Sequence, residues 1–189
     1  MNQKISLSQY RAIDLTILAA VLALCQSLIY LASSRWFPEQ LYVVSPVAAM
    51  TALVLMRWSA YAGIHAALGG VLFAALSGGS WKHFLIYGIG NLLSLAILPV
   101  LRGDRKEKIR GDALLTIVFA LAVQLLMQLG RGAVAALLAF PWVGCLGFIT
   151  TDLLSELFTC FVCWIVRRID GLFEDQKHYL LRIQSEQTR

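Results

Sequence analysis

The sequence predicts an all-α membrane protein, a bundle of six transmembrane helices whose termini both lie in the cytoplasm. Hydrophobic residues make up 59% of the 189 residues and charged residues only 14%, against roughly 25% charged residues in an ordinary soluble domain. The apolar residues form six long stretches, none with the period-two alternation of a membrane β-barrel strand. A spanning backbone must satisfy its own hydrogen bonds, so the stretches are expected to form helices. The whole chain, 1–189, is then a single transmembrane domain with a cytoplasmic tail from about residue 167 to 189.

The expected spans have an ordinary length except for the second. A helix crosses a bilayer with about 20 apolar residues, and about 17 suffice. The second stretch is shorter, and Pro46 near its start stands where proline costs a helix least. We expect this helix to be tilted, partly buried or lengthened by Leu41 and Tyr42. The six expected spans are 12–34, 43–56, 59–77, 81–101, 113–139 and 142–166.

Lysine and arginine are concentrated on one side of these spans. Six spans return the chain to its starting side, so the termini share that side with the loops after the second and fourth spans. Of the 16 Lys and Arg residues, all except Arg35, Lys82 and Arg131 fall there, which predicts a cytoplasmic location. A nucleic-acid interface is not expected, because a short loop between spans offers no groove-reading element. The residues on this side are Lys4, Arg11, Arg57, Arg102, Arg105, Lys106, Lys108, Arg110, Arg167, Arg168, Lys177, Arg182 and Arg189.

Other conspicuous residues predict structure rather than chemistry. Cys160 and Cys163 form a C-x-x-C on a membrane helix without a second pair, so we interpret them as apolar filling and not as a metal or redox site. The three histidines are scattered, and no P-loop is present, so no cofactor is expected and any ATPase must be another polypeptide. The residues expected to form an aromatic belt at the outer boundary are Trp36, Tyr42, Trp81 and Trp142.

Charged residues inside the spans are the strongest functional signal. Arg131 lies about nine residues from the outer end of the fifth span and Asp152 about ten residues from the outer start of the sixth, which places both roughly 13–15 Å below the outer surface. The tight turn at Pro141 makes the two helices antiparallel neighbours. A lone charge at this depth costs on the order of 3 kcal/mol, so we expect the two residues to pair or to line a wet cavity.

Further polar residues are expected beside this pair. Glu156 lies one helical turn deeper than Asp152 on the same face. With Arg131, the three charges leave one surplus carboxylate, which suits a ligand with an amine or N–H donors. The alternative is a structural salt bridge with amide hydrogen bonds that fix the helix register. The uncharged polar residues expected near this level are His65, Asn91, Gln124, Gln128, Thr150 and Thr151.

Small residues carry a second signal. Ala19 and Ala23 form an A-x-x-x-A in the first span, and Ala62, Ala66 and Gly70 repeat the spacing in the third. Small residues four apart permit close helix contact. We expect contacts within the chain to explain the third span, whereas for the first span an external partner competes with internal packing.

The combined pattern resembles the S component, the substrate-binding membrane subunit of energy-coupling factor (ECF) transporters. Six spans, both ends cytoplasmic, the A-x-x-x-A of the first helix and the basic loop before the fifth span carry the resemblance, which covers nearly the whole chain. None of the ligand-binding signatures of the thiamine, riboflavin or biotin members is present. The segments that look like an S component are RWSAYAGIHAALGG, IYGIGNL, MQLGRGAVA, GFITTDLLSELF and RRIDGLFEDQKHYLLR.

This resemblance implies uptake of a small, scarce, water-soluble nutrient, such as a vitamin or a modified nucleobase. The ligand is expected near the outer face, between the last three helices and the loops after the first, third and fifth spans. The small-residue face of the first helix, here Ala19 and Ala23, is expected to dock on a transmembrane coupling protein that carries two ABC ATPases. The positions implied around the ligand are Trp81, His83, Asn91, Arg131, Trp142, Asp152 and Glu156.

Two other classes of function compete with this interpretation. A membrane scaffold similar to the MreD-like rod-shape proteins has a comparable size and helix count and needs no ligand, but buried charges argue mildly against it. An intramembrane enzyme is less favoured, because no nucleophile–base pair or metal set is evident. His65 and Glu156 are an acid–base pair only if they face each other.

Overall fold

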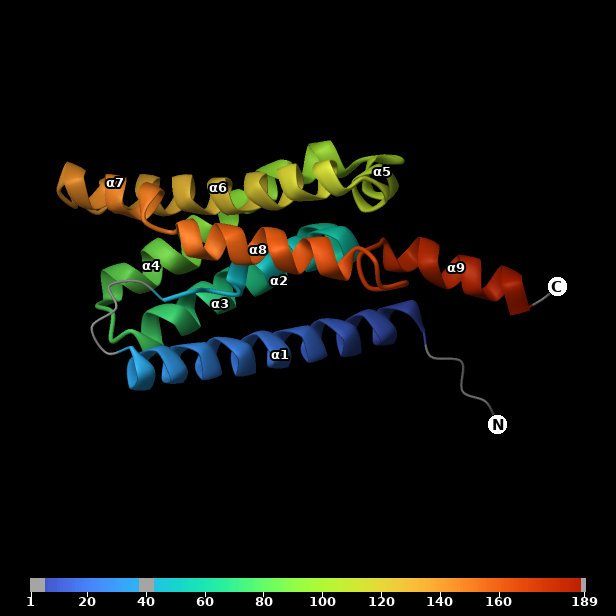
Figure 1. The fold of residues 1–189 in the computed structure, drawn as a ribbon, viewed down its shortest axis with the longest axis horizontal. Helices are drawn as coiled ribbons and strands as arrows, with labels where there is room; N and C mark the ends of the chain where they lie inside the picture. The colour runs from blue at the N-terminus through green and yellow to red at the C-terminus, as the bar shows by residue number, and fades with distance from the viewer. Residues whose placement is uncertain (1–5, 38–42, 188–189) are drawn as a thin grey trace.

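The computed structural model describes residues 6–37 and 43–187, and all regular elements in these ranges are helices (Figure 1). Lys4, Leu41, Tyr42 and Arg189 therefore lie outside the described residues. The elements in chain order are α1 Leu7–Trp36, α2 Val47–Trp58, the 3-10 turn η1 Ser59–Tyr61, α3 Ala62–Leu76, α4 Trp81–Gly90, the 3-10 segment η2 Asn91–Leu101, α5 Arg105–Gly111, α6 Ala113–Leu137, α7 Trp142–Thr150, α8 Leu153–Val166 and α9 Gln176–Gln187.

Five helical stretches of the described chain are long and apolar enough to cross a membrane. The expected second and third spans fall together in one of them, Val47–Leu76. This stretch is a hairpin of α2 and α3, because Ser59 turns the chain with a φ of 53°. Val47, at the start of α2, consequently lies beside Gly69 of α3 (Figure 1). The other four stretches are Leu7–Trp36, Trp81–Leu101, Ala113–Leu137 and Trp142–Val166.

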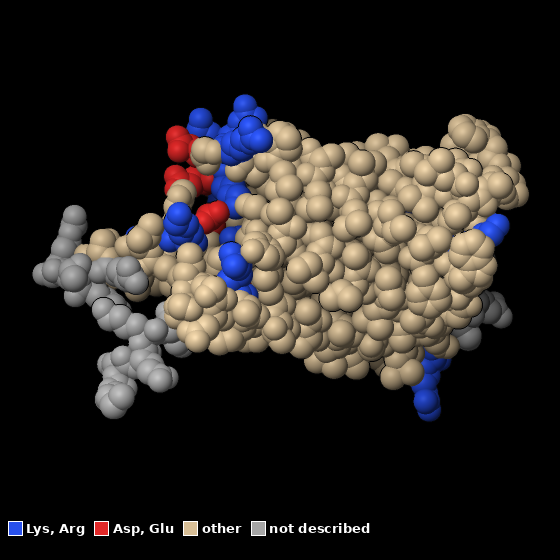
Figure 2. Space-filling view, turned by 180° about the vertical axis from the view of Figure 1, so that it is seen from behind, with Lys and Arg blue, Asp and Glu red and all other residues tan. Residues whose placement is uncertain are grey.

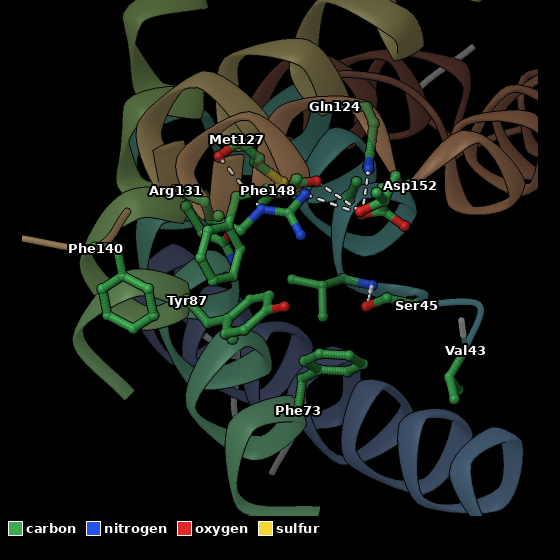
Figure 3. Close-up of a pocket in the computed structure, with 17 residues that line it drawn as sticks. Val43, Ser45, Phe73, Tyr87, Gln124, Met127, Arg131, Phe140, Phe148 and Asp152 are labelled. Atoms are coloured by element: carbon green, nitrogen blue, oxygen red, sulfur yellow. Dashed lines mark hydrogen bonds and ion pairs between the residues drawn. The ribbon is translucent and has the colours of Figure 1, made fainter. Parts of the chain in front are cut away.

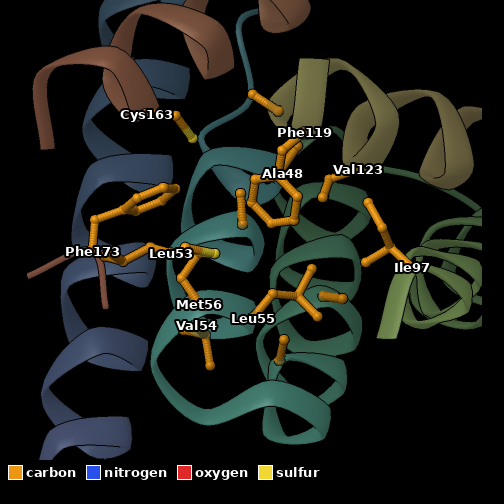
Figure 4. Close-up of a cluster of buried hydrophobic side chains, with 14 of the residues drawn as sticks. Ala48, Leu53, Val54, Leu55, Met56, Ile97, Phe119, Val123, Cys163 and Phe173 are labelled. Carbon is orange, nitrogen blue, oxygen red and sulfur yellow. The ribbon is translucent and has the colours of Figure 1, made fainter. Parts of the chain in front are cut away.

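The short helix α2 is the centre of the bundle. It packs against α1, α3, α6 and α8, and all of its residues except Met50 are buried. Its side chains, with Phe119 and Val123 of α6, form the main hydrophobic core (Figure 4). A helix that is apolar on all sides is typical of such a position. With 12 residues, α2 is about 18 Å long. Of the alternatives expected for the short second helix the structure shows burial, whereas Leu41 and Tyr42 lie outside the described residues.

Glycine allows three helices to approach closely where they cross. A Cβ atom at Gly130 of α6 would collide with the carbonyl oxygen of Gly90 in α4, and one at Gly70 of α3 would collide with that of Tyr87 in α4. Ala62 and Ala66 of α3 are fully buried. The prediction that the small residues of the third span pack within the chain is therefore confirmed.

Charged residues gather at one end of the bundle, as Figure 2 shows. The beginnings of α1 and α9 lie at this end together with α5 (Figure 1). Lys106 of α5 is 2.8 Å from Asp175, and Arg110 pairs with Asp170 and Glu174. Hydrogen bonds from Arg110, and then from Arg182, hold the pKa of the Asp170 carboxyl below its ordinary value. The basic loop thus packs on the acidic start of the tail, and we call this region the charged end.

The tail does not continue α8. The chain leaves α8 at Val166, turns through Gly171 with a φ of 71°, and begins the separate helix α9 at Gln176. Phe173 is fully buried and packs on Phe119 of α6, with their ring centroids 6.2 Å apart. The turn is therefore anchored in the core.

A buried arginine joins the tail to the first two helices. Arg57 of α2 donates to both carboxylate oxygens of Asp14 in α1, at 3.0 and 2.6 Å. Its Nη1 also donates to the carbonyl oxygens of Gly171 and Leu172, at 2.7 and 3.0 Å. Asp14 further accepts a hydrogen bond from the indole of Trp58. One side chain thus links α1, α2 and the tail at the charged end.

Candidate functional site

A cavity of about 370 Å³ lies between the helices (Figure 3). Its lining includes residues of α7, which lies at the end of the bundle away from the charged end (Figure 1). Its walls come from α3, α4, η2, α6, α7, the start of α2 and the segment of Val43 and Ser45 before it. Binding sites for small molecules have volumes of roughly 300–1,000 Å³. The cavity is therefore large enough for a small ligand. Of the seven positions implied around a ligand, it is lined by Asn91, Arg131 and Asp152.

An ion pair forms the polar side of this cavity. Arg131 Nη2 of α6 is 3.0 Å from Asp152 Oδ2, just before α8, and Gln124 Nε2 donates to the same oxygen at 2.9 Å. The expected pairing at matching depth is thus confirmed. The hydrogen bonds of Arg131 to Met127 and Asp152 use Nε and Nη2, so Nη1 is left pointing into the cavity (Figure 3). The pair joins α6 to α8 and leaves polar atoms available to a ligand.

Aromatic rings form the opposite side. Tyr87 of α4 lies at their centre, with ring centroids 4.9 Å from Phe73 of α3 and 5.8 Å from Phe148 of α7. Phe140, just before α7, packs edge-on against Phe148 at 6.0 Å. The guanidinium of Arg131 lies 5.4 Å from the Tyr87 centroid, within the range of a cation–π contact. The aromatic side and the polar side therefore meet at Tyr87.

Asn91 lies deeper in the cavity wall. Its Nδ2 donates to the carbonyl oxygen of Ala66 at 3.1 Å, so the side chain fastens η2 to α3. Its Oδ1 is buried and has no hydrogen-bond partner among the described residues. Gly70 makes room for this amide, because a Cβ there would come 2.7 Å from Asn91 Nδ2.

Glu156 does not line the cavity. Its Oε1 accepts a hydrogen bond from Gln128 Nε2 at 2.8 Å, one turn along both helices from the Gln124–Asp152 contact. The surplus carboxylate expected in the cavity is therefore held between α6 and α8 instead. The expected polar stripe on α6 exists, and Gln124 and Arg131 line the cavity. Gln128 between them binds Glu156 and lies outside the lining.

The three outer aromatic positions also lie outside the cavity lining. Trp81 and Trp142, at the first residues of α4 and α7, are 64% and 72% exposed, as residues of an aromatic belt would be. His83 closes a capping box at the start of α4, where its Nδ1 accepts from the Ser80 backbone N–H at 3.2 Å. Its ring packs on Phe140 and Phe148, so it contacts the aromatic side without lining the cavity itself.

Ala19 and Ala23 line a separate, shallow apolar groove of about 220 Å³ between α1 and α3. His65 of α3 also lines it, and its Nε2 is 3.0 Å from the carbonyl oxygen of Leu15 in α1. No hydrogen bond or ion pair of the described residues joins His65 to Glu156.

Sequence reasoning missed the aromatic side and Ser45. A phenylalanine in an apolar span can face lipid, the core or a cavity, and the sequence pattern is the same in each case. Nothing in the sequence therefore distinguished Phe73 or Phe148 as cavity residues. Tyr87 was the one detectable member, since it carries a hydroxyl in the middle of a span. Ser45 is held by α1 and α8: its Oγ donates to Gln26 at 3.0 Å and its N–H donates to Ser155 at 3.0 Å.

Comparison with family models, curated proteins and solved structures gave no match for this chain. The resemblance to S components therefore rests on the sequence features given above, and the functional argument rests on the geometry of the cavity.

Proposed function

We propose that this chain is the substrate-binding subunit, the S component, of an ECF-type importer for a small water-soluble nutrient of the vitamin or modified-nucleobase class. The observation that carries the proposal is the cavity of about 370 Å³ with the Arg131–Asp152 pair in its wall. A salt bridge that only fixed helix register would not need an open space beside it. Ionisable residues within membrane helices mark substrate pathways by default.

In this proposal the hairpin of α2 and α3 supplies the second and third of six spans in the cell membrane. The charged end faces the cytoplasm, since it carries the basic loop and the tail. The cavity then opens toward the outer half of the membrane, where a nutrient arrives. The groove at Ala19 and Ala23 docks on a transmembrane coupling protein, and two ABC ATPases on that protein drive transport.

Native mass spectrometry of the purified chain tests the binding function. We expect a small molecule bound one-to-one after mild detergent extraction, and its loss from Arg131→Gln. Reconstitution with the coupling protein and ATPases should then give ATP-dependent uptake of that molecule. A chain that retains no small molecule, and whose expression supports no uptake, would favour the scaffold function instead.

A further inference from the structure

The charges on the cavity wall cancel. Among its described lining residues only Arg131 and Asp152 are charged, and they are paired at 3.0 Å. Glu156, the nearest additional carboxylate on α8, is bound to Gln128 outside the lining. An ion that entered this cavity would lose its hydration without meeting an uncompensated charge of opposite sign, which is unfavourable. The cavity therefore favours an uncharged molecule.

The ion pair nevertheless leaves one donor and one acceptor unused. Asp152 Oδ2 accepts two hydrogen bonds, from Arg131 and Gln124, whereas Oδ1 makes none with a described residue. The hydrogen bonds of Arg131 to Met127 and Asp152 use Nε and Nη2, and Nη1 points into the cavity (Figure 3), where the guanidinium also interacts with the side chain of Tyr87. Neither atom is sealed off in the protein interior. A ligand with a carbonyl group beside an N–H group complements these two atoms, because its carbonyl oxygen can accept from Arg131 and its N–H can donate to Asp152.

The aromatic side selects for shape. Phe73, Tyr87 and Phe148 come from three different helices and already pack on one another, so the wall is formed without a ligand. Flat rings stack or pack edge-on against such a wall better than flexible chains do. At roughly 30 Å³ for each water-sized group, a cavity of about 370 Å³ holds about a dozen such groups, the size of a substituted monocycle or a small bicycle.

We propose that the ligand of this cavity is an uncharged, planar aromatic or heteroaromatic molecule with an amide or ring-lactam edge. Its carbonyl oxygen accepts from Arg131 Nη1, its N–H donates to Asp152 Oδ1, and its ring packs on the aromatic side. This proposal rests on the proposed function and narrows it, because it excludes carboxylate and cationic nutrients as the preferred substrates.

Four small probes of similar size separate the contributions of charge and ring. Benzamide is neutral and aromatic, benzoate is an anion, benzylammonium is a cation, and cyclohexanecarboxamide keeps the amide without the aromatic ring. Dissociation constants of all four are measured on the full chain in lipid nanodiscs by ligand-observed NMR at neutral pH. We expect benzamide to bind at least about tenfold more tightly than either ion, and several-fold more tightly than cyclohexanecarboxamide.

Two variants test the assignment of atoms. Arg131→Gln leaves the Asp152 charge unbalanced and should move the preference to benzylammonium, whereas Asp152→Asn should move it to benzoate. Glu107→Gln, at an exposed position of α5 at the charged end, is the matched control and should keep the wild-type order. The decisive comparison is between the four dissociation constants of the unaltered chain. The proposal can therefore be tested even if a variant fails to fold.

Either ion binding to the unaltered chain as tightly as benzamide would overturn the proposed ligand class, as would no binding of benzamide. The proposed function is judged separately, by the molecule that remains bound after purification. If that molecule is a carboxylate or a cation, the ligand class is wrong and the binding function stands.

Discussion

Arg131 couples the packing of two helices to the chemistry of the cavity. Its guanidinium joins α6 to Asp152 before α8, contacts the Tyr87 ring and directs Nη1 into the cavity. With Arg131 only 8% exposed, little water is available to compensate a broken contact. A ligand that binds here therefore meets a residue that the fold already holds in place.

The first prediction concerns the stability of this pair. Arg131→Ala leaves Asp152 without its cation, and removal of one member of a buried pair costs about 3–5 kcal/mol. The double variant Arg131→Ala/Asp152→Ala removes both charges, so we expect it to be more stable than the single variant. Unfolding of both in mild detergent, followed by circular dichroism, measures the difference; additive losses would show that the two side chains are not coupled.

The second prediction separates Glu156 from the cavity. Glu156→Gln keeps an acceptor for the Gln128 hydrogen bond and removes a charge at a residue outside the cavity lining. We expect the affinity for the co-purified ligand to change by less than about twofold, while the change from a charge-assisted to a neutral hydrogen bond lowers stability by roughly 1 kcal/mol. Isothermal titration and thermal unfolding on the same preparation give both values. A tenfold loss of affinity would return Glu156 to the binding site.

At this scale the sequence predicts polar contacts better than apolar ones. Arg131 and Asp152 could be paired beforehand, because consecutive antiparallel helices place them at equal depth and a lone charge is costly there. Phe73 and Phe148 could not be placed, because an apolar side chain in a membrane helix has no equivalent penalty for facing lipid. Glu156 lies outside the cavity lining although it shares a helix face with Asp152, because residues one turn apart share a face without sharing the neighbouring space.

Among the elements, α4 and α6 cross in close contact. Gly90 and Gly130 bring the two backbones together, and Arg131 follows Gly130 directly. The position of the Arg131 guanidinium in the cavity therefore depends on the backbone-to-backbone contact between Gly90 and Gly130.

The third prediction tests this crossing. Gly130→Ala places a methyl group against the carbonyl oxygen of Gly90, so the helices must separate. Overpacking of this kind costs about 1–3 kcal/mol, and we also expect weaker ligand binding because Arg131 moves. Gly111→Ala is the control, since a Cβ there meets no atom within 4 Å. Equal stability of both variants, measured by thermal unfolding, would show that the crossing is loose.

The fourth prediction concerns the groove between α1 and α3. Ala23→Trp fills the groove lined by Ala19 and Ala23, so we expect it to abolish assembly with the coupling protein. Ligand binding by the isolated chain should persist, because neither alanine lines the cavity. Leu24→Trp, at an exposed position of α1 outside the groove, is the matched control and should assemble normally. Co-purification of the complex reports the result; normal assembly of Ala23→Trp would place the docking surface elsewhere.

The whole molecule has one charged end and one nearly uncharged end (Figure 2). The sequence predicted this asymmetry and the helical bundle. The first follows from the positions of many Lys and Arg residues, and the second from several long apolar stretches. The sequence also predicted α2 and α3 as two separate helices, although α2 is shorter than a bilayer, and the structure packs them as a hairpin. The fold of the tail depended on single contacts, such as Arg57 with the carbonyls of Gly171 and Leu172.

The fifth prediction is the topology. In a background without native cysteines, Ala60→Cys, Lys108→Cys and Lys177→Cys should react only with reagents that reach the cytoplasm. Ala60 belongs to this set because neighbouring Ser59 accepts a hydrogen bond from Lys106 at 2.8 Å. Ser77→Cys, at the opposite end of α3, should react from outside intact cells. Labelling of Lys108→Cys from outside would reverse the orientation.

The central position of α2 has a consequence for biosynthesis. A ribosome completes α2 at Trp58 but reaches the start of α6, one of its main packing partners, only at Ala113. At about 5–20 residues per second, α2 waits several seconds for this partner and longer for α8. During that interval the nascent chain offers it only α1 and α3, and the Asp14–Arg57 pair is the one buried ion pair of the described residues that can already form between α1 and α2. Insertion into the membrane therefore has to precede completion of the core. During this stage Asp14 neutralises Arg57 where α1 first packs against α2.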